Sequence, residues 1–228
     1  MIGSFKRNQL TWAIWHTIDR GRMTTQEPPK KVLHLIRRLI DLDRQIGIDA
    51  RSRDVWRTKH AFIDGPTAGL GGENAYTVVD AVALWIGIEL LDAGLPQKEV
   101  TQFLRQLRNQ LQRAVLKLLA THLDLVEQTA RRRTGSEATK LMKGESLAPD
   151  ELLYLVTESV TPDGVLAAER KGVGSNLCQG RDALLRFMAE ASTTARRFMV
   201  VEIGNATLSL AYFLLISEPS KRGRPASE

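Results

Sequence analysis

The sequence has very little cysteine and no long apolar run, and both absences narrow the class of protein. Cys178 is the only cysteine among 228 residues, so an internal disulfide is excluded, which is compatible with a reducing compartment. The longest apolar stretches, at residues 78–91 and 206–216, are too short or too interrupted to span a bilayer. The opening MIGSFKRNQL has no apolar core of the kind that secretory signals carry. We therefore expect a cytoplasmic protein with no membrane partner.

Catalytic and metal-binding motifs are also missing. Neither an HExxH nor a paired-cysteine pattern accompanies the four scattered histidines, His16, His34, His60 and His122. No G-x-S-x-G occurs, and Cys178 lies in no pattern typical of a catalytic thiol. The glycine-rich loop at residues 65–72 lacks the Gly-Lys-Ser/Thr ending of a phosphate-binding loop. These absences predict a protein that is not an enzyme and needs neither a metal nor a cofactor.

One acidic pattern keeps an enzymatic alternative open. Pro162-Asp163 followed by Glu169-Arg170-Lys171 is similar to the PD…ExK signature of metal-dependent nucleases, in which the two acids hold Mg²⁺. Here Asp163 falls in a predicted turn, and Glu169 lies several residues along the returning strand. At about 3.3 Å per residue the two carboxylates are too far apart to share one ion easily. A nuclease using Asp163 and Glu169 is therefore the minor alternative.

The net charge of +6 is distributed in blocks. Residues 1–60 carry 13 basic and 6 acidic groups, and residues 101–143 carry 9 and 3. Residues 61–100 carry 1 basic and 6 acidic groups, and residues 144–228 carry 9 and 11. Positive charge concentrated in the first half attracts polyanions at long range, which makes DNA the expected partner. A solvated basic surface without such a partner is the alternative.

Apolar periodicity and capping signals predict four helices in residues 1–130, at about 8–19, 30–46, 77–93 and 97–130. The second is amphipathic, and its polar side is mainly basic: Lys30, His34, Arg37, Arg38, Asp41 and Arg44. The loop GPTAGLGGEN at residues 65–74 is compatible with the turn of a small β-wing that has Phe62 and Tyr76 on its arms. This order predicts a winged-helix-like N-terminal half.

The fourth predicted helix carries a heptad seam. Its apolar positions alternate in steps of four and three, with one threonine among them: Val100, Leu104, Leu107, Leu111, Ala114, Leu118, Thr121 and Leu125. A helix over residues 97–130 is roughly 50 Å long. We expect it to pair two chains into a homodimer. The alternative is a central core helix of a single chain.

The C-terminal half is predicted to hold a small α+β unit. A charged linker at residues 131–150 precedes strands at 152–160 and 165–171, joined by the turn Thr161-Pro162-Asp163-Gly164. A helix at 181–191, a strand at 198–203 and a helix at 206–217 complete the order ββαβα. The predicted fold class is mainly α, divided into residues 1–130, the linker 131–150, the unit 151–217 and a disordered basic tail, 218–228.

Two motifs resemble those of DNA-binding proteins. The tail segment Lys221-Arg222-Gly223-Arg224-Pro225 resembles an AT-hook core, which implies that Arg222 and Arg224 lie in a narrow minor groove. The segment YTVVDAVAL, starting at Tyr76, the turn Gly94-Leu95-Pro96 and the heptad helix resemble the MerR-type transcription regulators over residues 76–108. In that family the helix before the wing lies in the major groove, and a long helix pairs two chains.

The MerR resemblance implies a set of DNA-binding residues. The helix from Lys30 to Arg44 would be the reading helix, with Lys30 among its DNA-binding residues and His34, Arg37 and Arg38 facing the groove. Arg53, Arg57 and Lys59 would contact phosphates on or beside the wing. We therefore expect a dimeric DNA-binding protein, either a transcription regulator or a nucleoid-associated factor. The alternative from another class is a protein–protein adaptor, in which the heptad helix and the C-terminal strands bind a partner protein. No feature identifies a target sequence or a ligand of the C-terminal unit.

Overall fold

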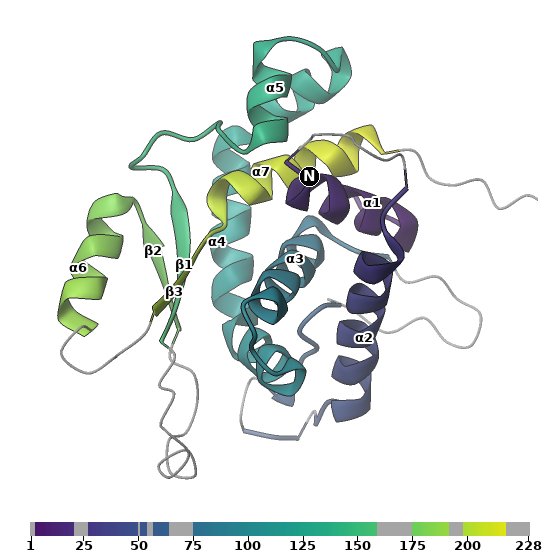
Figure 1. Ribbon diagram of the computed structural model, residues 1–228, viewed down its shortest axis with the longest axis vertical. Helices are drawn as coiled ribbons and strands as arrows, with labels where there is room; N and C mark the ends of the chain where they lie inside the picture. Colours follow the sequence, from purple (N-terminus) through teal and green to yellow (C-terminus); the bar gives the residue numbers. More distant parts are fainter. Residues whose placement is uncertain are drawn as a thin grey trace, which may run out of the picture.

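The computed structural model describes residues 3–20, 27–49, 51–53, 57–63, 75–158, 175–191 and 198–217. These ranges are mainly helical and contain one small antiparallel sheet of three strands near the C-terminus (Figure 1), which confirms the expected fold class in outline. The helices are α1 (Arg7–Ile18), α2 (Lys30–Ile46), α3 (Val78–Asp92), α4 (Gln97–Arg132), α5 (Ser136–Lys143), α6 (Arg181–Ala191) and α7 (Gly204–Ile216). The strands are β1 (Leu153–Glu158), β2 (Ser175–Gln179) and β3 (Phe198–Glu202).

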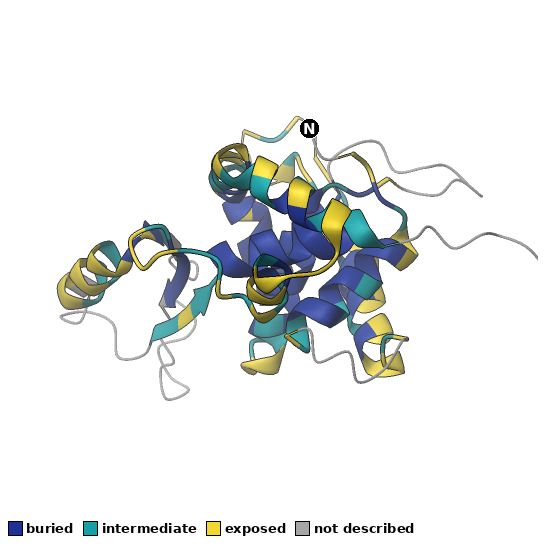
Figure 2. Ribbon diagram, turned by 90° about the horizontal axis from the view of Figure 1, so that it is seen from above, coloured by how far each residue is buried: buried dark blue, intermediate teal, exposed yellow. Residues whose placement is uncertain are grey.

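The core lies where α1, α3, α4 and α7 pack together. The two most apolar helices, α3 and α7, are buried on nearly every side, because a helix without a polar face is stable in water only when its neighbours cover it. Figure 2 shows buried residues gathered in the middle of this helical body and exposed residues at its rim. None of the helices in the described ranges has the length and apolarity that a membrane crossing requires.

The sheet lies beside α4, on the side opposite α1, α2 and α3 (Figure 1). Its strand order is β2-β1-β3, with β1 antiparallel to both neighbours and Leu155 opposite Leu177 and Val201. The face that contains Leu155 joins the main core with α4 and α7. The opposite face, with Tyr154, forms a small separate cluster under α6. The alternation of side chains along β1 therefore connects two cores of different size.

α4 is the central element, and its seam is only partly as expected. The first four seam positions, Val100, Leu104, Leu107 and Leu111, are buried within this single chain. The buried line then continues through Val115, Leu119 and Val126, while seam residues Ala114, Leu118 and Leu125 are half-buried. This shift follows from the 3.6-residue turn of a straight helix, which drifts from a seven-residue repeat. The first half of the seam is therefore a core contact, as in the alternative interpretation.

Several expected elements differ or fall outside the described residues. β1 pairs with Ser175–Gln179, whereas the expected second strand at 165–171 is not described. The expected linker contains α5, whose Ala138 and Leu141 are buried. Tyr76 pairs with Phe5 through backbone bonds of 2.8 and 2.9 Å, and no residue in 57–63 belongs to a strand. The remainder of the expected wing, at 64–74, and the tail, at 218–228, lie outside the described ranges.

Candidate functional site

A buried ion pair fastens the end of α2 to α4. Asp43 lies on the buried side of α2, and its Oδ1 is 2.6 Å from Nε of Arg105. Arg105 also donates from Nη1 to the carbonyl oxygen of Gly47, 2.7 Å away, at the end of α2. The other carboxylate oxygen of Asp43 accepts the backbone N–H of Ala61 at 2.8 Å. One carboxylate therefore joins α2, α4 and the segment at residues 57–63.

A second buried pair lies one turn further along α4. Arg108 donates to Oδ1 of Asp80 and, over 3.1 Å, to the carbonyl oxygen of Ala61. Asp80 also completes the N-terminal cap of α3, where it accepts the backbone N–H of Thr77 at 2.7 Å. Arg105 and Arg108 are 3% and 2% exposed. Two of the basic groups in the block at residues 101–143 are therefore neutralised inside the protein and add nothing to its surface potential.

The basic residues of α2 and of the following loop stay outside. The backbone N–H of Asp49 donates to the carbonyl oxygen of Arg57 at 2.7 Å, which closes the loop onto the end of α2. We call the exposed side of α2 together with residues 51–53 and 57–59 the basic surface. Its exposed cations are Lys30, Lys31, Arg37, Arg38, Arg44, Arg51, Arg53, Arg57 and Lys59. Only two exposed carboxylates, Asp41 and Asp49, lie among the described residues from 30 to 59.

The structure brings seven of the nine predicted DNA-binding residues onto this basic surface. Lys30, His34, Arg37 and Arg38 are exposed on α2, and Arg53, Arg57 and Lys59 are exposed in the loop. The remaining two, Arg222 and Arg224, lie outside the described residues.

Two of the seven are oriented by α4. Nη2 of Arg38 donates to Oε1 of Gln97 at 3.0 Å, and Nζ of Lys59 donates to Oδ1 of Asn109 at 3.2 Å. Both partners are neutral amides, so they position the cations without cancelling their charge. A third residue, Arg37, lies 3.8 Å from Asp41, and both side chains are well exposed, so solvent screens this pair strongly.

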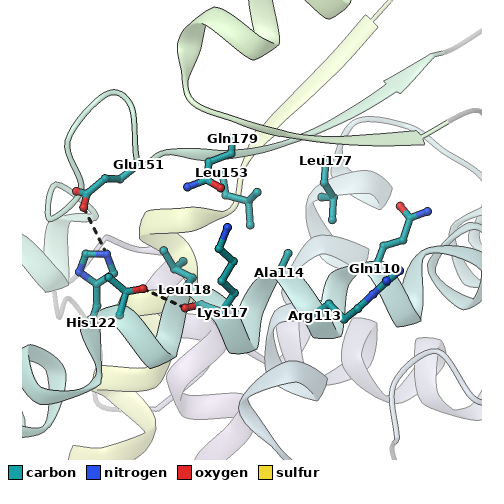
Figure 3. A pocket seen from close by; sticks show the side chains of 11 residues that line it. Gln110, Arg113, Ala114, Lys117, Leu118, His122, Glu151, Leu153, Leu177 and Gln179 are labelled. Atoms are coloured by element: carbon teal, nitrogen blue, oxygen red, sulfur yellow. Dashed lines mark hydrogen bonds and ion pairs between the residues drawn. The ribbon is translucent and has the colours of Figure 1, made fainter.

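A hollow that the sequence did not predict lies between α4 and the sheet (Figure 3). This α4–sheet cleft has a volume of about 480 Å³. Its lining comes from α4, β1, β2 and the segment that leads into β1: Gln110, Arg113, Ala114, Lys117, Leu118, Thr121, His122, Glu151, Leu153, Leu177 and Gln179. Sequence reasoning had one local signal, because Arg113, Lys117 and Thr121 recur every four residues on the outer side of α4. The strand residues opposite them are far along the chain.

No cluster of His, Cys, Asp or Glu able to hold a metal ion occurs within the part of the chain that the structure describes. Asp163 and Glu169, the pair on which the nuclease alternative depends, lie outside that part. Comparison with known proteins provides no relative: no protein-family model, curated protein or solved structure matches the chain. Inference about function therefore depends on the basic surface and the α4–sheet cleft alone.

Proposed function

We propose that the protein binds DNA through the basic surface and acts in the cytoplasm as a transcription regulator or nucleoid-associated factor. The observation that carries the proposal is the excess of nine exposed cations over two exposed carboxylates on α2 and its loop. Such a surface replaces the counterions condensed on DNA phosphates, and the released ions drive association. The third described aspartate of this stretch, Asp43, is buried and paired, so it does not offset the surface charge.

The shape of the basic surface supports contact with a groove. α2 has 17 residues and is therefore about 25 Å long. A helix with side chains is roughly 10–12 Å wide, close to the width of the major groove. With α2 in the groove, His34 and Arg37 face base edges, and Arg53, Arg57 and Lys59 reach the flanking phosphates. Arg222 and Arg224 add minor-groove contacts in this proposal.

The proposal includes a homodimer whose interface involves only the second half of α4, and not the whole heptad seam. Since Val100, Leu104, Leu107 and Leu111 are covered by the same chain, two copies cannot meet through them. The second half of α4 exposes Leu116, whose exposed fraction is 51%. Pairing through this half would place two basic surfaces in one particle, which increases affinity for a palindromic site.

The test is the salt dependence of binding to a short fluorescent duplex, followed by anisotropy. We expect the triple variant Arg53→Gln, Arg57→Gln, Lys59→Gln to reduce the slope of log K against log salt by about 2 to 3, because roughly 0.9 counterion is released per phosphate contact. The matched control removes three exposed cations near α5: Arg132→Gln, Lys140→Gln and Lys143→Gln. Equal losses in both variants, or no binding by the unmodified protein at about 50 mM salt, would contradict the proposal.

The adaptor alternative has one observation in its favour. Leu185 of α6 and Val200 of β3 are 63% and 39% exposed, and both lie in the small sheet region. Exposed apolar side chains of this kind occur at protein interfaces, although single ones are common on any surface. The adaptor alternative would be favoured if the protein failed to bind DNA but bound a partner protein, and if a Leu185→Ser substitution removed that binding.

A further inference from the structure

We propose that the α4–sheet cleft is a binding site for a small organic anion with an apolar body, such as a medium-chain or aromatic carboxylate. The cleft volume of about 480 Å³ lies within the range of small-molecule sites, which runs from about 300 to 1,000 Å³. Its lining combines four apolar residues, which form the floor, with seven polar or charged residues, which can orient a ligand.

The floor of the cleft is apolar. Ala114 and Leu118 come from α4, and Leu153 and Leu177 come from neighbouring strands of the sheet. Leu153 is 7% exposed, whereas Ala114, Leu118 and Leu177 keep part of their surface in contact with water in the cleft. A ligand with a hydrocarbon chain or ring would remove this surface from water, which favours binding.

The rim of the cleft is cationic. Arg113 and Lys117 lie one turn apart on α4, and both are exposed. The lining has one carboxylate, Glu151, and its Oε1 lies 3.7 Å from Nε2 of His122, on the far side of Lys117 from Arg113 (Figure 3). Among the residues that the structure describes, no carboxylate forms an ion pair with Arg113 or Lys117. Lys117 therefore attracts an anionic group into the cleft, and Arg113, whose Nε donates to the carbonyl oxygen of Asn109 at 3.3 Å, adds positive potential from its place along α4.

Amide groups complete the polar part of the site. Gln110 extends from α4 and Gln179 from β2, and Figure 3 shows Lys117 directed from α4 toward the strands, where Gln179 lies. An amide nitrogen and an ammonium group together offer a carboxylate two donors at fixed positions. DNA phosphates could approach the same cations, but a duplex would leave the apolar floor uncovered. Because the apolar floor lies next to a cationic rim, a small amphipathic anion fits the cleft better than DNA does.

The test uses octanoate as the probe, with the full chain followed by calorimetry and by amide chemical shifts. The neutral analogue octanamide has nearly the same shape without the charge, and inorganic phosphate has the charge without the apolar body. We expect octanoate to bind at least about tenfold more tightly than either, because octanamide lacks the charge-assisted contact and phosphate lacks the apolar contact with the floor. Shift changes should cluster at residues 110–122 and 177–179.

Two variants of the protein assign the binding to the cleft. Lys117→Gln should weaken octanoate about tenfold, whereas Lys140→Gln, an exposed change on α5, should leave the affinity unaltered. Ala114→Leu should abolish binding by filling the floor, and its unfolding transition shows whether the fold persists. Three results would each overturn the proposal: no octanoate binding at millimolar concentration, equal affinity for octanamide, or equal effects of Lys117→Gln and Lys140→Gln. Preferential binding of phosphate would indicate a simple anion site and would overturn it as well.

Discussion

The two halves of α4 use the same residue type for opposite purposes. In residues 97–111, Arg105 and Arg108 are buried and paired with aspartates of α2 and α3. In residues 112–132, Arg113 is exposed and lines the α4–sheet cleft. The difference comes from the surroundings, since α2 and α3 enclose the first half, whereas the second half faces a small sheet that leaves a hollow beside it. Counts of basic residues along a sequence therefore do not measure surface charge.

Substitution of a buried arginine should have the largest effect on stability. We expect Arg105→Ala to lower the free energy of unfolding by about 3–5 kcal/mol, because it leaves Asp43 buried without its cation. Arg113→Ala, two turns later on the same helix, should change it by less than about 0.5 kcal/mol. Urea unfolding followed by circular dichroism measures both values. Similar values for the two variants would show that the halves of α4 do not differ as described.

Substitution of an apolar residue should also lower the free energy of unfolding more in the first half of α4 than in the second. Leu111 is 0% exposed in the core, and Leu116 is 51% exposed. Leu111→Ala should cost about 2–5 kcal/mol, because it leaves a cavity in a packed core. Leu116→Ala should cost less than about 0.5 kcal/mol in dilute protein. The same unfolding assay, repeated at high protein concentration, detects a dimer through Leu116, because only an interface residue shows a cost that grows with concentration.

The smallest effect concerns a buried polar group that lacks the partners that Arg105 and Arg108 have. His16 is 1% exposed, and its ring centroid lies 4.1 Å from that of Trp12 and 5.4 Å from that of Phe213. Neither ring nitrogen has a hydrogen-bond partner in the described part of the chain. Burial lowers the pKa of His16 below its ordinary 6.5, against a smaller opposing effect of Asp19. The unfolded chain therefore takes up a proton first when the pH falls below about 6.5.

The contribution of neutral His16 to the free energy of unfolding is therefore fully present above pH 6.5, and it is lost as the pH decreases toward the lowered pKa. The slope for one proton cannot exceed about 1.4 kcal/mol per pH unit. We expect His16→Leu to flatten this part of the curve of unfolding free energy against pH. An unchanged slope between pH 7 and pH 5 in the variant would show that other groups cause the acid sensitivity.

The helical part of the fold could be predicted because its signals are local. Periodic apolar residues located α2, α3 and α4, and the Thr77 cap is present, with the N–H of Asp80 3.2 Å from the hydroxyl oxygen of Thr77. α5 was missed because its apolar stripe of Ala138, Leu141 and Met142 covers little more than one turn, which is too short to show a period. β2, at 175–179, was not predicted, because its sequence, SNLCQ, is half polar, as suits an edge strand. The predicted strand at 165–171 lies outside the described residues.

The two buried ion pairs, Asp43–Arg105 and Asp80–Arg108, could have been predicted from the positions of their aspartates. Asp43 follows Ile36 by seven residues and Leu39 by four, which places it on the apolar side of α2. Asp80 stands inside an apolar segment. Two acids at buried positions require two buried cations, and Arg105 and Arg108 flank the seam. The α4–sheet cleft left no comparable signal, because it depends on how the sheet lies against α4, and that arrangement brings together residues from distant segments.

The contact between α1 and α7 has a consequence for how the chain is made. Nε2 of Gln9 donates to the carbonyl oxygen of Ser217, 208 residues later, and α1 packs along α7. At ribosomal rates of roughly 5–20 residues per second, α7 follows α1 by about 10–40 s. During that interval the apolar residues of α1, α3 and α4 lack the helix that covers them. The nascent protein should therefore be a client of chaperones until α7 emerges from the ribosome.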